Sequence, residues 1–161
     1  MDKAQFIHLV SSEQEALRKF LLALCLGNRD ESDDIAQEAL VKAYLSSSSY
    51  QDNGKFTAWL YKIAYNTFLD HQRGRRKLSP LDTCQHLDDG ASADKGFQYQ
   101  DLYRALDEIP PKERTSILLF YIKGYSIKEI SQIVECGEDA IKMQLSRGRK
   151  HLKQKLENRE S

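Results

Sequence analysis

Cysteine, proline and long apolar runs are scarce in this sequence, and each shortage excludes a class of protein. Three cysteines, at positions 25, 84 and 136 of 161 residues, are too few and too scattered for a disulfide scaffold. Eight glycines and three prolines exclude collagen-like and proline-rich chains. The longest apolar run, Phe20–Leu26, has seven residues, whereas a helix that spans a bilayer needs ~20.

The sequence also lacks the patterns of targeting, metal and catalytic sites. Residues 1–5 do not show the basic and then apolar layout of a signal peptide. Cys84 and His86 supply two potential metal ligands, whereas structural zinc needs four at a recognisable spacing. No glycine-rich phosphate loop is present, and the four histidines are dispersed. We therefore predict a cytoplasmic, reduced protein that is not an enzyme, with no metal, cofactor, small-molecule substrate or direct membrane insertion.

The net charge is zero, because 24 Lys and Arg balance 24 Asp and Glu, but the charges are unevenly distributed. Residues 78–100 carry one Lys and four Asp, a net charge of −3, and no helical apolar stripe. We interpret this acidic segment as a linker, since a structureless stretch of that length fits poorly inside one compact domain. The sequence therefore predicts two small lobes, residues 1–77 and 101–161, each with a modest core.

Apolar residues recur at helical spacing through both lobes, and no stretch alternates with period two. We therefore predict an all-α fold of two small helical domains joined by a flexible linker. Asp30–Asp33 are typical of a helix N-terminus. Phe56 begins a long helix that ends in a basic run, and Leu102, Leu106 and Ile109 predict a short helix after the linker.

The end of the chain predicts a helix-turn-helix. Ser126–Val134 is a short amphipathic helix with a capping box, Glu135–Gly137 is a turn, and Glu138–Leu156 is a second helix rich in cations. In such a motif the second helix enters the major groove of DNA. The alternative is an ordinary helical hairpin with a basic surface helix.

The helix Lys55–Gln72 combines aromatic side chains with cations and amides, and residues 73–77 add four cations. Tyr61 and Tyr65 lie off the apolar face of Phe56, Leu60 and Ile63, where they could stack on unpaired bases. The alternative is that aromatics at helical spacing belong to the core.

Three segments together resemble the extracytoplasmic-function sigma factors, the smallest members of the sigma-70 family. Residues 34–44 resemble the second conserved segment of the family. Residues 56–66, with Asp70 and the basic run, resemble the segment that melts and reads the minus-10 element. Residues 109–111, 124–130 and 141–149 resemble the fourth conserved region, which binds the minus-35 element.

The resemblance implies an alternative sigma factor that binds bacterial core RNA polymerase and directs promoter-specific transcription initiation. Residues 1–77 would be region 2, 78–100 the linker and 101–161 region 4. The first lobe would contact the beta-prime coiled coil and the second lobe the beta flap. An unstacked base would enter a pocket formed by residues 56–76 and the loop 46–54. A plain helix-turn-helix regulator is the alternative, although residues 1–77 lack the strand and helix alternation of a receiver domain.

The resemblance also assigns site residues. Core polymerase would be contacted by Asp34, Gln37, Glu38 and Lys42. The minus-10 element would be contacted by Trp59, Tyr61, Lys62, Tyr65, Asn66, Asp70, Arg73, Arg75 and Arg76. The minus-35 element would be contacted by Lys142, Met143, Gln144, Arg147 and Lys150.

Two further expectations come from the family. Its members are commonly held inactive by an anti-sigma factor, so a partner of this kind is expected. They often carry glycine at the start of the helix-turn-helix turn, where this chain has Glu135. Met143 and Gln144 replace more usual small polar and basic residues, which affects the promoter sequence that is read rather than the fold.

Overall fold

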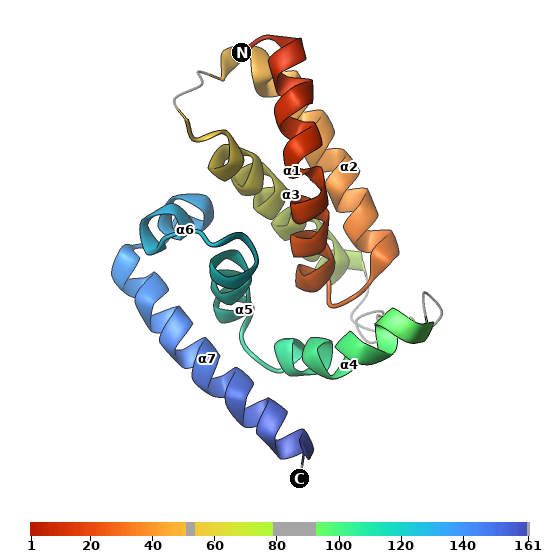
Figure 1. The fold of residues 1–161 in the computed structure, drawn as a ribbon, viewed down its shortest axis with the longest axis vertical. Helices are drawn as coiled ribbons and strands as arrows, with labels where there is room; N and C mark the ends of the chain where they lie inside the picture. The colour runs from red at the N-terminus through yellow and green to blue at the C-terminus, as the bar shows by residue number, and fades with distance from the viewer. Residues whose placement is uncertain (51–53, 79–92, 161) are drawn as a thin grey trace.

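The computed structural model describes residues 1–50, 54–78 and 93–160, and these form helices without any strand. The described residues make two lobes, α1–α3 and α4–α7 (Figure 1). The predicted all-α architecture is confirmed. No helix within the described ranges is both long enough and apolar enough to cross a membrane.

The first lobe packs α1 (Lys3–Leu24), α2 (Arg29–Ser46) and α3 (Phe56–Leu78) around a common core, with a short 3-10 turn, Ser47–Ser49, after α2. Asp2 caps α1 in a capping box with Gln5. The cap of α2 is Asn28, whose side chain accepts from the Glu31 amide. The sequence pattern placed the cap within Asp30–Asp33, so the helix begins earlier than predicted. Asp30 and Glu31 lie instead in the first turn, where carboxylates complement the helix dipole.

The second lobe contains α4 (Ala93–Asp107), α5 (Pro111–Leu118), a π-helical turn (Leu119–Lys123), α6 (Ile127–Val134) and α7 (Glu138–Glu160). Pro111 occupies the start of α5, where its missing amide costs nothing. The predicted capping box of Ser126 and Glu129 is present at α6. Helices α6 and α7 thus form the predicted helix-turn-helix.

The helix that follows the expected linker is longer than the sequence pattern predicted. Apolar spacing indicated a short helix around Leu102 and Leu106, whereas α4 begins at Ala93 and includes the last eight residues of the 78–100 segment. Gly96 does not prevent this, because an isolated glycine costs a helix only ~1 kcal/mol. Residues 79–92, including Cys84 and His86, lie outside the described residues.

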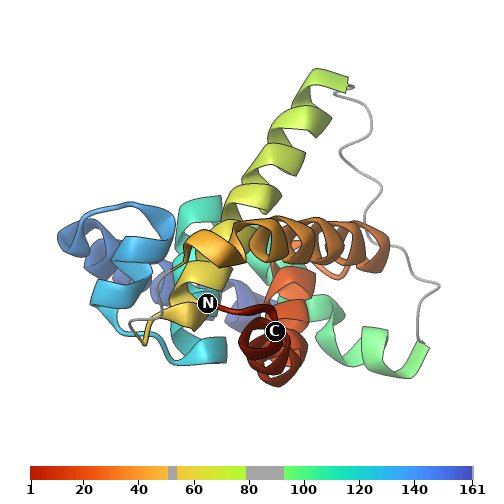
Figure 2. The ribbon, with the colours of Figure 1, turned by 90° about the horizontal axis from the view of Figure 1, so that it is seen from above.

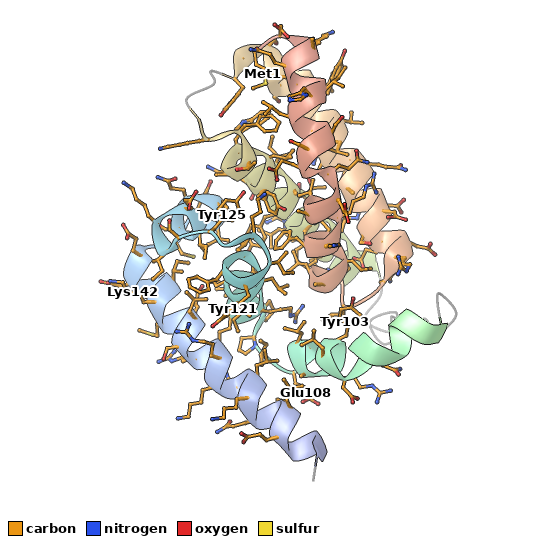
Figure 3. The ribbon with its side chains drawn as sticks, in the orientation of Figure 1. Met1, Tyr103, Glu108, Tyr121, Tyr125 and Lys142 are labelled. Atoms are coloured by element: carbon orange, nitrogen blue, oxygen red, sulfur yellow. The ribbon has the colours of Figure 1, made fainter. Side chains whose placement is uncertain are left out.

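The two lobes pack against each other, so their buried apolar side chains form one continuous cluster. Helices α1 and α3 meet α5, the π-helical turn and α6 (Figures 1 and 2); we call this contact the lobe interface. At its edge the Tyr103 ring of α4 lies against Gly27, where an added Cβ would come within 2.9 Å of the ring (Figure 3). Gly27 also has φ +88°, so this close turn is suited to glycine.

Candidate nucleic-acid interface

Helix α3 carries a polar stripe along its length. Lys62, Asn66, Asp70 and Arg73 recur every three or four residues, which places them on one side of a helix. Asn66, Asp70 and Arg73 are exposed, and Asp70 pairs with both Arg73 and Lys42, the latter at 3.7 Å. The C-terminal part of α3 projects away from the body of the molecule (Figure 2). The part of the stripe from Asn66 to Arg73 is therefore accessible to a large ligand.

The backbones of Arg75 and Arg76 continue α3 beyond the stripe. Their side chains lie outside the described part of the chain, so their predicted phosphate contacts stay predictions. Residues 51–53 of the predicted pocket loop are also outside it.

The two tyrosines of the predicted minus-10 face are buried rather than turned to solvent. Tyr61 is 0% exposed and lies 5.3 Å from the Phe20 ring, and Tyr65 is 8% exposed. Burial raises the pKa of both phenols above their ordinary value, and the neighbouring Tyr125 adds to the effect on Tyr61. Their expected position off the core is therefore wrong in this arrangement. Tyr61 lies between Phe20 of α1 and Tyr125 of the second lobe. Thr115 and Cys136 of the second lobe lie beside Tyr65.

Trp59 occupies an intermediate position. It is partly buried, and its ring stacks on Tyr50 with the centroids 4.6 Å apart. Phe56 lies 5.6 Å from the same indole ring. An aromatic group of this kind beside the 46–54 segment could contribute one wall of a base pocket.

The helix-turn-helix presents a second candidate surface on α7. Ile141 and Leu145 are buried together with Ile130 and Ile133 of α6, which fixes the rotation of α7 about its axis. The opposite side is exposed and carries Lys142, Met143, Arg147 and Lys150. Met143 keeps half of its surface accessible, and the position of Lys142 on the outside of α7 is visible in Figure 3.

One predicted minus-35 residue faces inward in part. Gln144 is half-buried, and its side-chain oxygen accepts a hydrogen bond from Ser116 Oγ at 2.7 Å. This bond ties α7 to α5. Gly148 of α7 allows the same two helices to approach closely, because a Cβ at this position would lie 2.4 Å from Ile117 Cδ1 of α5.

Helix α2 presents a third surface. The residues predicted to bind a protein partner share one face, with Asp34, Gln37 and Glu38 exposed and Lys42 half-buried. Sequence reasoning missed Val41 and Leu45, which are 58% and 72% exposed. Their spacing of three and seven residues from Glu38 continues the same face, so helical periodicity could have identified them.

Side-chain contacts join this α2 face to the α3 stripe. Glu38 Oε2 lies 2.8 Å from His71 Nε2, and Lys42 Nζ donates to Thr67 Oγ1 at 3.4 Å. The predicted protein-binding and DNA-binding faces therefore share charged residues at their boundary.

The lobe interface itself places unexpected partners beside the minus-10 residues. Lys62 Nζ pairs with Glu135 Oε1 at 2.9 Å, and Lys123 Nζ pairs with Glu13 Oε2 at 2.5 Å. Tyr61 and Tyr125 meet edge to face at 5.5 Å. These pairs are separated by 64 to 110 residues in the chain, so no local sequence pattern indicates them.

Polar groups inside the lobe interface are only partly satisfied. The hydroxyl oxygen of Tyr61 is buried, and it has no hydrogen-bond partner among the described residues. Such a group costs about 1–3 kcal/mol. Glu135 has φ +58°, a left-handed conformation that costs a residue with a Cβ roughly 1–2 kcal/mol.

A metal site is not part of this arrangement, because no group of three or more His, Cys, Asp or Glu side chains in the described ranges could hold an ion. The surfaces described above are long, charged and helical. They suit contacts with a polyanion and with protein helices.

Comparisons with known proteins agree with these surfaces. The family model described as Sigma-70 region 2 matches residues 9–78, and that described as Sigma-70, region 4 matches residues 99–152. The ECF RNA polymerase sigma factor SigW of Bacillus subtilis is 33% identical in an alignment of 146 positions that covers 81% of this chain and 78% of that protein. The ECF RNA polymerase sigma factor EcfG of Rhodopseudomonas palustris is 29% identical, and the match covers 85% of this chain and 77% of EcfG.

Solved structures share the arrangement of helices. The sigma factor RpoE from Bartonella quintana, crystallised with the anti-sigma factor NepR, superposes with a TM-score of 0.79 at 27% identity, over 95% of this chain and 97% of RpoE. CnrH, solved with the cytosolic domain of CnrY, gives a TM-score of 0.76 at 22% identity, over 98% of this chain and 90% of CnrH. The second likeness concerns the fold alone.

Proposed function

The chain belongs to the extracytoplasmic-function RNA polymerase sigma factors of the sigma-70 family, and from this membership we propose how its surfaces share the work of promoter recognition. As a sigma factor it acts in transcription initiation and is a regulatory factor rather than a catalyst. The proposed domains are 1–77 for region 2, 78–100 for the linker and 101–161 for region 4. The ranges of the two family matches, 9–78 and 99–152, support this division.

The α2 face binds the beta-prime coiled coil of core RNA polymerase. Asp34, Gln37 and Glu38 supply polar contacts, and Val41 and Leu45 supply an exposed apolar strip between them and the end of the helix. A mixed face of this kind suits a helical partner, since apolar residues are exposed at a protein–protein interface and polar ones surround them. The second lobe binds the beta flap.

The α3 stripe reads and opens the minus-10 element. Lys62 and Arg73 hold phosphates, Asn66 and Asp70 position the backbone and a base, and Trp59 stacks on an unpaired base of the non-template strand. Opening a base costs a few kcal/mol, which these contacts offset. Arg75 and Arg76 extend the cationic end of this surface, and Tyr61 and Tyr65 join it when the second lobe moves away.

The exposed side of α7 reads the minus-35 element in the major groove. Lys142, Arg147 and Lys150 are free of the core and can reach phosphates or guanine edges. Met143 offers apolar contact to a base. Gln144 reaches DNA only if it gives up its bond to Ser116.

One observation carries this proposal: the two sigma-70 regions match in order on the two lobes that bear the α3 stripe and the exposed α7 face. The test is run-off transcription with purified bacterial core polymerase on fragmented genomic DNA, with start sites mapped. We expect new start sites that share a two-part upstream motif. Binding to duplex DNA by the chain alone, with no effect on polymerase, would instead support a plain helix-turn-helix regulator.

An anti-sigma partner is also proposed, because RpoE was crystallised with the anti-sigma factor NepR and this chain is similar to RpoE over nearly its whole length. Co-purification of the tagged chain from its own bacterium, followed by addition of the captured protein to the run-off reaction, tests it. A captured protein that leaves transcription unchanged would contradict this assignment.

A further inference from the structure

The lobe interface covers the side of α3 on which several minus-10 residues lie. Tyr61 and Tyr65 are buried there, and Lys62, between them, is paired with Glu135 of the second lobe. Bases reach the two tyrosine rings only after the lobes separate, whereas Lys62, whose side chain is 42% exposed, needs only to leave Glu135 to contact a phosphate. The consequence for DNA binding rests on the proposed function, since the covered residues matter only if this face of α3 binds the minus-10 element.

The ion pairs Glu13–Lys123 and Lys62–Glu135 cross the lobe interface. Lys123 and Glu13 are 2.5 Å apart with side chains 22% and 17% exposed, and the Lys123 ammonium lies 6.0 Å from the centre of the Tyr61 ring. This pair therefore sits well inside the interface, where removal of one charge leaves the other poorly solvated. The pair of Lys62 and Glu135 is more exposed and lies at the rim.

Other features of the same interface oppose closure. The Tyr61 hydroxyl gains hydrogen-bond partners from water when the lobes part. Glu135 holds a left-handed conformation in the turn, and its carboxylate reaches Lys62 from there. An interface that combines charged attraction with an unsatisfied buried hydroxyl is suited to reversible opening.

We propose that the free chain is self-inhibited: its second lobe closes over the minus-10 face of α3, and the pair of Glu13 and Lys123 is the latch. Lys62 and Glu135 form an accessory rim contact. The chain opens when the two lobes take their separate positions on core polymerase. Neither Glu13 nor Lys123 is among the individual residues assigned to polymerase or DNA contacts.

The test measures the distance between the lobes in the free, full-length chain. Fluorescent dyes are attached through unnatural amino acids at the exposed positions Ser11 of α1 and Gln154 of α7, so the three native cysteines stay in place. Single-molecule energy transfer at low salt should show one short-distance population for the wild type. Glu13→Gln should raise the separated population at least about threefold, because it leaves the Lys123 charge without its partner.

The matched control is Glu15→Gln, which removes the same charge from the same helix at a residue that pairs with Lys19 within α1. It should keep the wild-type distances. Lys123→Gln tests the latch from the other lobe if Glu13→Gln does not fold, as judged by circular dichroism. Separated lobes in the wild type, or unchanged distances in a folded latch variant, would overturn the proposal.

A second measurement asks whether closure of the lobes inhibits binding of minus-10 DNA. Single-stranded DNA that carries the minus-10 sequence mapped by run-off transcription is titrated with the free chain. Glu13→Gln should bind it several-fold more tightly than the wild type and Glu15→Gln. Equal binding, in a variant that opens and supports normal transcription with polymerase, would show that closure is not inhibitory. Absence of transcription in every chain would instead count against the proposed function.

Discussion

The two helices assigned to DNA, α7 and α3, present their residues in opposite ways. The α7 surface is open: Lys142, Met143 and Arg147 point to solvent while Ile141 and Leu145 anchor the helix. The N-terminal half of α3 is covered on the side of Tyr61 and Tyr65. A surface that reads duplex DNA needs charged side chains, which tolerate water, whereas one that stacks on unpaired bases needs aromatic side chains, which pack against apolar groups.

The comparison therefore separates two properties of a DNA-reading helix. The rotation of α7 is fixed by the small core of its own lobe. The accessibility of α3 depends on where the other lobe lies. Perturbing each helix should consequently give a different pattern of effects on stability and on promoter activity.

The largest expected effect comes from removing a ring beneath the covered helix. Phe20→Ala should lower the free energy of unfolding by about 3–5 kcal/mol, because Phe20 is fully buried and packs on Tyr61. Chemical denaturation followed by circular dichroism measures this loss. Since the two lobes share one cluster, we expect the whole helical signal to shift as one transition.

Ile7→Ala is the control for Phe20→Ala, since Ile7 lies on the same helix but is 58% exposed. It should cost less than about 0.5 kcal/mol. A loss below about 1 kcal/mol in Phe20→Ala, or two separate transitions in the wild type, would contradict a shared core.

The open helix should show the reverse pattern, with activity lost and stability kept. Arg147→Ala should weaken promoter binding by the polymerase holoenzyme by about 1–3 kcal/mol if Arg147 reads a base. If it contacts only a phosphate, the effect should be smaller and the slope of log affinity against log salt should fall by about one. Lys153→Ala, farther along α7, is the control, and equal promoter binding by both variants would remove Arg147 from the reading surface.

Alkaline pH should weaken the lobe interface, where Tyr61 of α3 meets Tyr125 of the second lobe. Burial raises the pKa of the Tyr61 and Tyr125 phenols, so both stay protonated in the folded chain at a pH where the unfolded chain ionises. The free energy of unfolding therefore does not change with the titration of these phenols below their ordinary pKa of about 10, and it declines as the pH rises above that value. Denaturation midpoints measured from pH 8 to 11.5 should show this decline.

Tyr61→Phe tests how much of this decline comes from the Tyr61 phenol. The variant keeps the ring and removes a buried hydroxyl without a partner among the described residues, so it should be about 1 kcal/mol more stable at pH 8. Its decline above pH 10 should be shallower than that of the wild type. An identical decline would assign the alkaline effect to other groups.

The smallest net effect is expected at the turn between α6 and α7. Glu135→Gly relieves a left-handed residue that carries a Cβ, worth roughly 1 kcal/mol, and removes a solvent-exposed ion pair worth about 0–1 kcal/mol. Thermal unfolding should therefore rise slightly or stay unchanged, while energy transfer between the lobes shows more separation. A clear loss of stability would mean that the rim pair contributes more than its exposure allows.

Local sequence patterns predicted much of each lobe. Ser126 and Glu129 indicated the start of α6, Pro111 indicated the start of α5, and apolar spacing placed Ile141 and Leu145 against the neighbouring helix. These features depend on groups within a few turns of one another. The early start of α4 was missed, because its first residues have no apolar stripe and flank an acidic segment.

The candidate surfaces were predicted unevenly for the same reason. Exposure of Asn66, Asp70 and Arg73 on α3, and of Asp34 and Glu38 on α2, follows from helical spacing. Val41 and Leu45 were missed, since an apolar residue on a helix is normally assigned to the core. Their helical spacing from Glu38 would have placed both on the exposed face of α2.

By itself the sequence determined most of the helices, the capping box of α6, the helix-turn-helix and the family, because each depends on short-range periodicity or on ordered motifs. Only the tertiary structure decided that the second lobe covers Tyr61 and Tyr65 and that Lys123 pairs with Glu13. Contacts between residues more than a hundred positions apart depend on the shape of both lobes and on how well their surfaces fit. No local pattern of charge or hydrophobicity specifies that fit.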